Sequence, residues 1–405
     1  MNFLNEVAMD YPHAISFAPG RPPEDLFKVK EHLEAIHGFV ADLSRRTGLQ
    51  MEQAWQQLGQ YHRTNGIINE LIAAHLAQDE GIRVSSDAIM VTVGAQEAMA
   101  VILAGLFEPA QDILLSSDPT YIGITGLARI FGIRVVAVPA GDDGIEPRKV
   151  EEAIARASAL GRVRALYDIP DFNNPLGTML PLERRKELIE VCRLNDVLLI
   201  EDNPYGLFVY EGERLPSLKS LDSQGTVLYI GSFSKTLFPG LRLGYLVADQ
   251  ATAPQGPLLA RELSKAKSLI TVNTSPIMQA VVGGVLLASQ GTIAPAAQAK
   301  IERLHRNRDV MVNRLARNFC GFEGTIHWNR PRGGFFLTLT LPFGFGREEL
   351  KICAEDYGVV VCPMCLFALG PGREHQIRLS FSYVTEDEIH TGLDRLTRFV
   401  RKHLA

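Results

Sequence analysis

Short apolar runs alternate with longer helical patterns through the middle of the chain. The runs are rich in β-branched residues and have the length of strands. Such alternation is typical of a largely parallel sheet with helices on both faces. In that architecture, ligands bind just beyond the carboxyl ends of the strands. The runs cover residues 89–93, 113–116, 135–138, 163–169, 197–201 and 227–231.

The pattern changes near residue 292. A long charged helix is predicted to residue 319, followed by the apolar run GGFFLTLTL, a helix at 347–357, two strand-like runs and an amphipathic helix from residue 386. A chain of 405 residues is longer than a single hydrophobic core usually supports, so we expect more than one domain. We predict an α/β protein with a large domain at 45–290, and a smaller α+β domain formed by 1–44 and 291–405.

The composition narrows the function classes. Hydrophobic residues make up 46% and charged residues 21%, as in an ordinary globular protein. The net charge of −5 provides no basic field for nucleic acid or an anionic membrane surface. Five cysteines, an odd number, do not suggest a disulfide framework, and no apolar run has the ~18 residues of a membrane span. We therefore expect a cytoplasmic protein.

The segment GSFSKTLFPGLRLGY, residues 231–245, follows an apolar run and carries the strongest chemical signal. Ser232, Ser234 and Arg242 can donate hydrogen bonds to a phosphate, and Lys235 offers an amine that nearby positive charge can make nucleophilic. The alternative is a solvated turn with a surface lysine.

The segment VLLIEDNPYG places Asp202 and Tyr205 at the end of another apolar run. The pyridoxal phosphate (PLP) ring needs an anion at its pyridine nitrogen and a phenol near its 3-oxygen, and these two residues fit those roles. An acidic residue at a strand end is as often a helix cap or an ion-pair partner, so this signal counts mainly in combination.

Three further strand ends carry candidate groups. In VTVGAQEAM, Gly94 turns a strand into a helix, and the backbone amides of Ala95 and Gln96 form an anion site there. In DPTY, Tyr121 can stack on a pyridine ring. In YDIPDFNNPLG, Asn174 can donate to the cofactor 3-oxygen.

Arg378 lies on an otherwise apolar run, HQIRLSFSY. A buried arginine needs an anionic partner, and a substrate carboxylate bound bidentate meets that need. A structural salt bridge is the alternative.

Together these motifs resemble the fold-type I PLP enzymes, and among them the class I/II aminotransferases of the 2-aminoadipate and kynurenine type. The resemblance spans nearly the whole chain, and several motifs in family order are far more specific than one. It is carried by AISFAPGRPPEDLF, QYHRTNG, VGAQEAM, DPTY, FNNPLG, EDNPY, SFSKTLFPGLRLGY, RGGFF and IRLSF.

The resemblance implies a seven-stranded-type sheet in the large domain, and amino-group transfer from an amino acid to a 2-oxo acid. Lys235 is then the Schiff-base lysine, and Arg378 and Asn174 contact substrate. Tyr61, in QYHRTNG, resembles the tyrosine that reaches the partner's cofactor phosphate in a homodimer. The implied cofactor ligands are Gly94, Ala95, Gln96, Tyr121, Asn174, Asp202, Tyr205, Ser232, Ser234, Arg242 and Tyr61.

The substrate class stays open at this point. The subgroup accepts long aliphatic, dicarboxylic and aromatic amino acids, often with 2-oxoglutarate as the partner. Arg21, in APGRPP, lies where the subgroup contacts the substrate side chain and can pair with a distal carboxylate. Phe17, Phe336 and Phe367 are candidates for an aromatic pocket or for simple core. The runs VGAQEAM, DPTYIGITG and IRLSFSY also resemble arylglycine transaminases of peptide antibiotic pathways.

Four alternatives remain. The same scaffold supports PLP-dependent decarboxylation, elimination or oxidation of amino acids. Regulatory effector domains of DNA-binding proteins share it, as do catalytically inactive binding proteins, although Lys235, Asp202 and Arg378 argue against inactivity. The motif CPMC at 362–365 has the spacing of thiol redox or zinc sites, but zinc needs two further ligands, and we interpret the spacing as coincidental.

Overall fold

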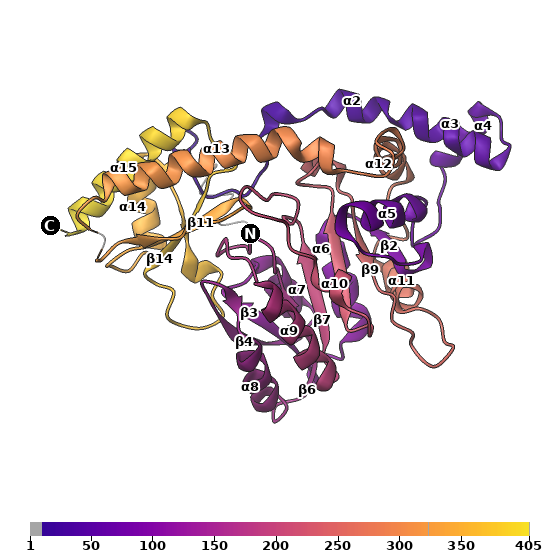
Figure 1. Cartoon of the computed structure of the whole chain (residues 1–405), viewed down its shortest axis with the longest axis horizontal. Coiled ribbons are helices and arrows are strands. Elements are labelled where there is room, and N and C mark those ends of the chain that lie inside the picture. Colours follow the sequence, from indigo (N-terminus) through magenta and orange to yellow (C-terminus); the bar gives the residue numbers. More distant parts are fainter. Residues whose placement is uncertain (1–9, 323, 405) are drawn as a thin grey trace.

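The computed structural model describes residues 10–322 and 324–404, and an eight-stranded sheet forms its centre (Figure 1). Along the sheet the strand order is β2-β9-β8-β7-β6-β3-β4-β5. The strands are β2 (Ile89–Thr92), β3 (Asp112–Asp118), β4 (Arg134–Gly141), β5 (Gly144–Ile145), β6 (Arg162–Asp168), β7 (Leu198–Asn203), β8 (Val227–Ser232) and β9 (Gly244–Val247).

The expected, mainly parallel sheet is confirmed. Strands β4, β3, β6, β7 and β8 are parallel neighbours, whereas β9 runs antiparallel to both β8 and β2. The sequence pattern did not predict β9 or the short edge strand β5. The connection 233–243 is too short for a parallel crossover, so β9 returns antiparallel. The strand β5 pairs back on β4 through a tight hairpin and adds an eighth strand to the expected seven.

Helices cover the sheet because each has an apolar face at helical spacing. In α8 (Pro147–Ala157), for example, Val150, Ala153, Ile154 and Ala157 are buried, and Pro147 occupies the first turn, where its missing N–H costs nothing. The other helices of this part are α5 (Asn69–His75), η2 (Leu76–Glu80), η3 (Ser86–Ala88), α6 (Gly94–Leu106), α7 (Ile122–Ile130), α9 (Leu182–Leu194), α10 (Leu218–Leu221), η4 (Pro239–Leu241), α11 (Leu259–Ile270) and α12 (Pro276–Ala288).

A second, four-stranded antiparallel sheet lies in the C-terminal part, with the order β10-β11-β14-β13. The long helix α13 runs beside it and on toward α12 (Figure 1). The elements are α13 (Ala294–Asn318), β10 (His327–Trp328), β11 (Phe336–Thr340), α14 (Arg347–Tyr357), β12 (Val359–Val360), β13 (Cys362–Pro363), η5 (Met364–Leu366), β14 (Gln376–Ser380) and α15 (Glu386–Leu404).

The N-terminal segment joins this C-terminal part. Strand β1 (Ile15–Ser16) pairs in parallel with β12, and the chain then passes through η1 (Glu24–Leu26), α2 (Val29–Glu34), α3 (Ile36–Thr47) and α4 (Met51–Leu58). The expected boundary at 44/45 falls inside α3, and the boundary at 290/291 falls between α12 and α13. The division into two domains stays a prediction, and residues 1–9 of the N-terminal part lie outside the described residues.

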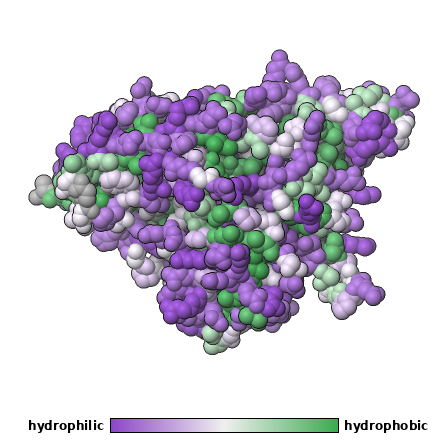
Figure 2. Space-filling view, in the orientation of Figure 1, coloured by the Kyte–Doolittle hydropathy of each residue, from purple (hydrophilic) through white to green (hydrophobic). Residues whose placement is uncertain are grey.

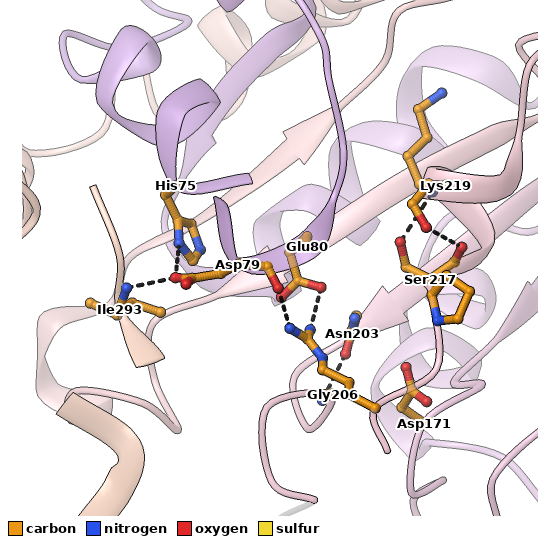
Figure 3. Close-up of polar contacts among 12 residues, drawn as sticks. His75, Asp79, Glu80, Asp171, Asn203, Gly206, Ser217, Lys219 and Ile293 are labelled. Atoms are coloured by element: carbon orange, nitrogen blue, oxygen red, sulfur yellow. Dashed lines mark hydrogen bonds and ion pairs between the residues drawn. The ribbon is translucent and has the colours of Figure 1, made fainter. Parts of the chain in front are cut away.

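A buried polar cluster joins η2 to the start of α13 and to the segment after β7 (Figure 3). The His75 ring contacts Asp79 at 2.7 Å, and the Asp79 carboxylate accepts the Ile293 amide at 2.6 Å. Glu80 forms an ion pair with Arg214. These contacts tie η2 to the start of α13 and to the segment after β7.

The visible face of the molecule is mainly hydrophilic, with apolar patches between the charged regions (Figure 2). Within the described residues, no helix has the length and apolar character needed to cross a bilayer. All five cysteines have free thiols, and burial raises the pKa of Cys362 to about 11.

A buried ion pair holds the start of α6, whose first turn faces the strand ends. Lys267 of α11 has a fully buried side chain and contacts Glu97 Oε2 at 2.7 Å. The same Glu97 oxygen accepts the Val93 amide at 2.6 Å, one residue before the Gly94 turn. Glu97 also accepts the Thr271 hydroxyl.

We expect Lys267→Ala to destabilise the protein strongly, because it leaves the Glu97 carboxylate buried without its cation. Breaking a buried pair from one side costs roughly 3–5 kcal/mol. The matched control is Lys265→Ala on the same helix, which removes the exposed pair with Glu262 and is expected to change little. Urea unfolding of both variants checks this, and equal free energies of unfolding would contradict the role given to Lys267.

Candidate active site

A cavity of about 520 Å³ lies where the carboxyl ends of the strands meet the C-terminal part. Parallel strands bring their carboxyl ends to one edge of the sheet, so residues distant in sequence converge there. All the site residues predicted from the sequence line this cavity, except Gly94 and Tyr61. The predicted residues that line it are Arg21, Ala95, Gln96, Tyr121, Asn174, Asp202, Tyr205, Ser232, Ser234, Lys235, Arg242 and Arg378.

Lys235 lies in the turn after β8, and its amine is inside the cavity. Its Nζ donates to the Gly20 carbonyl at 2.8 Å. Burial, together with the nearby guanidinium groups of Arg378 and Arg242, lowers the pKa of Lys235 to about 8. A far larger fraction of this amine than of an exposed lysine is therefore neutral and nucleophilic near neutral pH.

Asp202, at the end of β7, has a buried carboxylate in which only one oxygen accepts a hydrogen bond. Its Oδ2 accepts a hydrogen bond from Tyr167 at 2.6 Å, whereas Oδ1 has no hydrogen-bond partner in the described part of the chain. Burial raises the pKa of Asp202 to about 7. A protonated ring nitrogen placed against Oδ1 both satisfies this oxygen and stabilises its charge.

One end of the cavity is built to bind an anion. The amides of Ala95 and Gln96 lie in the first turn of α6, where they have no partner within the helix. Gly94 has φ 72°, and a Cβ there would lie 2.6 Å from Arg242 Nη2, so only glycine lets the guanidinium approach. Arg242 itself has a left-handed backbone, with φ 47°. Such strain is typical of functional sites.

A second binding group, Arg378, lies on β14 beside this cavity. Its guanidinium carbon is 4.2 Å from the centre of the Phe336 ring and 4.7 Å from that of Phe367. Nη1 donates to Asn174 Oδ1 at 2.6 Å, Nη2 donates to the Ala18 carbonyl, and Nε has no partner. Within residues 10–322 and 324–404, no carboxylate pairs with Arg378, so an anionic ligand would supply the missing partner.

The contact with Arg378 also orients Asn174. Because Asn174 Oδ1 accepts the guanidinium, its Nδ2 points the other way as a donor. The neighbouring Tyr205 is buried and lines the cavity. Burial raises the pKa of Tyr205, and Tyr121 has a pKa of about 12 for the same reason, so both phenols keep their protons.

Tyr61 lies outside this cavity. It follows α4, and 78% of its surface is exposed. Phe17, considered for an aromatic pocket, is fully buried in the core, whereas Phe336 and Phe367 do line the cavity.

Several cavity residues were missed by the sequence analysis. Tyr383 lines the cavity, as do the N-terminal residues Pro12, Ala14 and Ser16. The N-terminal residues are held there by the pairing of β1 with β12, a contact that no local pattern reveals. Tyr167 was also missed. Its only signal is its place near the end of an apolar run, one strand away from Asp202.

Comparison with known proteins decides the family. The family model for aminotransferase class I and II matches residues 29–396. This chain belongs to the class I and II aminotransferases. It is 44% identical to a (S)-3,5-dihydroxyphenylglycine transaminase from Amycolatopsis orientalis, over 100% of this chain and 92% of that protein.

Solved aminotransferase structures have the same fold. The kynurenine aminotransferase of Pyrococcus horikoshii, in complex with PMP, superposes with a TM-score of 0.85 at 28% identity, over 100% of this chain and 94% of that one. The alpha-aminoadipate aminotransferase of Thermus thermophilus, complexed with N-(5'-phosphopyridoxyl)-L-leucine, has a TM-score of 0.81 at 29% identity, over 98% and 95%. This aminotransferase is a fold-type I enzyme that depends on PLP.

The residues of this aminotransferase fit that cofactor. The unpartnered Asp202 Oδ1 suits a protonated pyridine nitrogen, and the α6 turn with Arg242 suits a phosphate. Lys235 supplies an amine in the same cavity.

The pKa of Lys235 gives a test of this arrangement. We expect the cofactor-free protein to form its visible PLP adduct with a rate that rises with pH through a midpoint near 8, because the amine loses its proton there. In Arg378→Ala the midpoint moves up, since one of the charges that lower the pKa is gone. Stopped-flow absorbance measures both, with the exposed Arg332→Ala as the control. An unchanged midpoint in Arg378→Ala would contradict the arrangement.

Proposed function

We propose that this aminotransferase takes the amino group from an arylglycine or another aromatic L-amino acid, with Arg378 holding the substrate α-carboxylate. The observation that carries this proposal is the buried Arg378 guanidinium between Phe336 and Phe367. In an arylglycine the ring is attached directly to Cα. Aromatic surface is therefore needed beside the group that holds the carboxylate, which is where these two rings lie. The 44% identical relative is named as a dihydroxyphenylglycine transaminase.

The chain's own groups then account for the chemistry. Bound PLP supplies an aldehyde carbon that carries the amino group and a ring that accepts electrons. Lys235 would hold the cofactor through its amine, and its neutral Nζ would be the base that takes the proton from the substrate Cα. Asp202 holds the charge at the ring nitrogen. Tyr205 and Asn174 bind the ring oxygen, and Tyr121 stacks on the ring.

Arg378 also favours transfer over other PLP reactions. A carboxylate bound by a guanidinium is held in place, which suits cleavage of the Cα–H bond better than loss of that carboxylate.

The cofactor phosphate is bound by a separate set of groups: the amides of Ala95 and Gln96 after the Gly94 turn, with Ser232, Ser234 and Arg242.

A dicarboxylic donor, such as 2-aminoadipate, is the second candidate. Arg21 lines the cavity, 5.9 Å from the Tyr383 ring centre, and no ion pair joins it to a carboxylate in the described part of the chain. A distal substrate carboxylate is a fitting partner for it.

Two arginine variants separate these substrates. We expect Arg378→Ala to lower kcat/KM by at least about 100-fold for all amino donors alike, because every donor loses its charge-assisted carboxylate contact. Arg21→Ala is expected to affect 2-aminoadipate and glutamate and to spare phenylglycines and tyrosine. Steady-state kinetics with this panel measures both effects. Aromatic donors that are poor substrates of the unchanged enzyme would contradict the arylglycine proposal.

We further propose that the enzyme is a homodimer with shared sites. Tyr61 is exposed and unused in its own cavity, and exposed apolar residues lie nearby on 269–277, among them Leu269 at 90% and Val272 at 50% exposure. Gln279, two residues after this segment, accepts the Ile67 amide at 2.8 Å and so connects α12 to the loop after Tyr61. A partner that covers this surface would receive Tyr61 at its cofactor phosphate.

Mixing two inactive variants tests the shared site. In a heterodimer of Lys235→Ala with Tyr61→Ala, one pocket has both an intact lysine and the partner's intact tyrosine. After joint refolding we expect activity clearly above that of either variant alone. Absence of any gain, with heterodimers shown by mass spectrometry, would contradict the sharing of Tyr61.

A further inference from the structure

Tyr167 lies on β6, the strand next to the one that carries Asp202. In the parallel pairing of β6 with β7, Tyr167 is opposite Ile200, and Asp202 is two residues further along β7. Side chains two residues apart on a strand point to the same face, so Tyr167 and Asp202 are diagonal neighbours on one face. Asp202 lines the cavity, but Tyr167 does not and is fully buried.

The contact between them has the length of a charge-assisted hydrogen bond. The Tyr167 hydroxyl lies 2.6 Å from Asp202 Oδ2, within the range typical of a hydroxyl donating to a carboxylate. Burial strongly raises the pKa of Tyr167, so the phenol keeps its proton and is the donor. The bond occupies Oδ2 and leaves Oδ1 as the oxygen without a partner.

The neighbouring carboxylate of Glu201 shows how burial acts on an acid that has no phenol as a hydrogen-bond donor. Glu201, next to Asp202 and completely buried, has a pKa raised to about 8 although it accepts two backbone amides. Burial is also the largest effect on Asp202, and the Tyr167 hydrogen bond opposes it. Asp202 is therefore near the balance between its charged and neutral forms, and loss of the Tyr167 hydrogen bond would shift that balance toward the neutral form.

We propose that Tyr167 is a positioning residue, which holds Asp202 charged and turns Oδ1 toward the cavity, so that the carboxylate can pair with the protonated ring nitrogen of the cofactor. This inference rests on the proposed role of Asp202. Tyr167 touches neither substrate nor cofactor, and it acts only through Asp202.

The test compares two ligands that form no covalent bond with Lys235: pyridoxamine phosphate, and its analogue in which a CH group replaces the ring nitrogen. The analogue cannot carry the ring proton, so the ratio of the two dissociation constants measures the pairing with Asp202. We expect the unchanged protein to prefer pyridoxamine phosphate by at least about tenfold. In Tyr167→Phe this preference falls by roughly tenfold or more, since a hydrogen bond to a charged group is lost. Isothermal titration calorimetry at neutral pH measures the constants.

Tyr229→Phe is the matched control, because Tyr229 is equally buried on the adjacent strand β8 and has no contact with Asp202. Its preference should match that of the unchanged protein. A Tyr167→Phe protein that binds both ligands more weakly by the same factor, or equally well, would overturn the proposal for Tyr167. No preference in the unchanged protein would instead overturn the role of Asp202.

Discussion

The buried carboxylate of Asp202 is the constraint around which the site is arranged. A carboxylate at the end of an interior strand has lost most of its water, and burial alone would make it neutral. To remain charged it needs a donor on one oxygen and a cation on the other. Tyr167 provides the first, and the cofactor's ring nitrogen fits the second. The electron-accepting ring of PLP depends on this charge.

The positive groups are arranged around the same carboxylate. Lys235, Arg242 and Arg378 all face the cavity, and their mutual repulsion contributes to the low pKa of Lys235. The lowered pKa of the amine thus follows from burial beside two guanidinium groups, for which we propose a phosphate and a carboxylate as ligands. The same charges that bind the ligands also prepare the lysine.

Much of this could be predicted from the sequence because the site residues are attached to strong local signals. Lys235, Asp202 and Asn174 each follow an apolar run, and parallel strands necessarily bring such ends together. The contribution of the N-terminal segment depends on the pairing of β1 with β12, which lie more than 300 residues apart, and local patterns do not encode such a pairing.

Tyr167 was missed for a different reason. A tyrosine in an apolar strand usually serves the core, and only the register of β6 against β7 shows that its hydroxyl meets Asp202. The sharing of Tyr61 with a second subunit stays a prediction, because Tyr61 is exposed and lies outside the cavity of its own protomer.

The most direct measurement is the position of the cofactor on the chain. Borohydride reduction converts the bond between PLP and its lysine into a stable amine, which peptide mass spectrometry locates. The account predicts modification at Lys235 alone. Lys300 is the informative competitor, because burial lowers its pKa to about 8 as well, although it donates to the Thr236 carbonyl and does not line the cavity. Modification at Lys300, or an unmodified Lys235, would contradict the account.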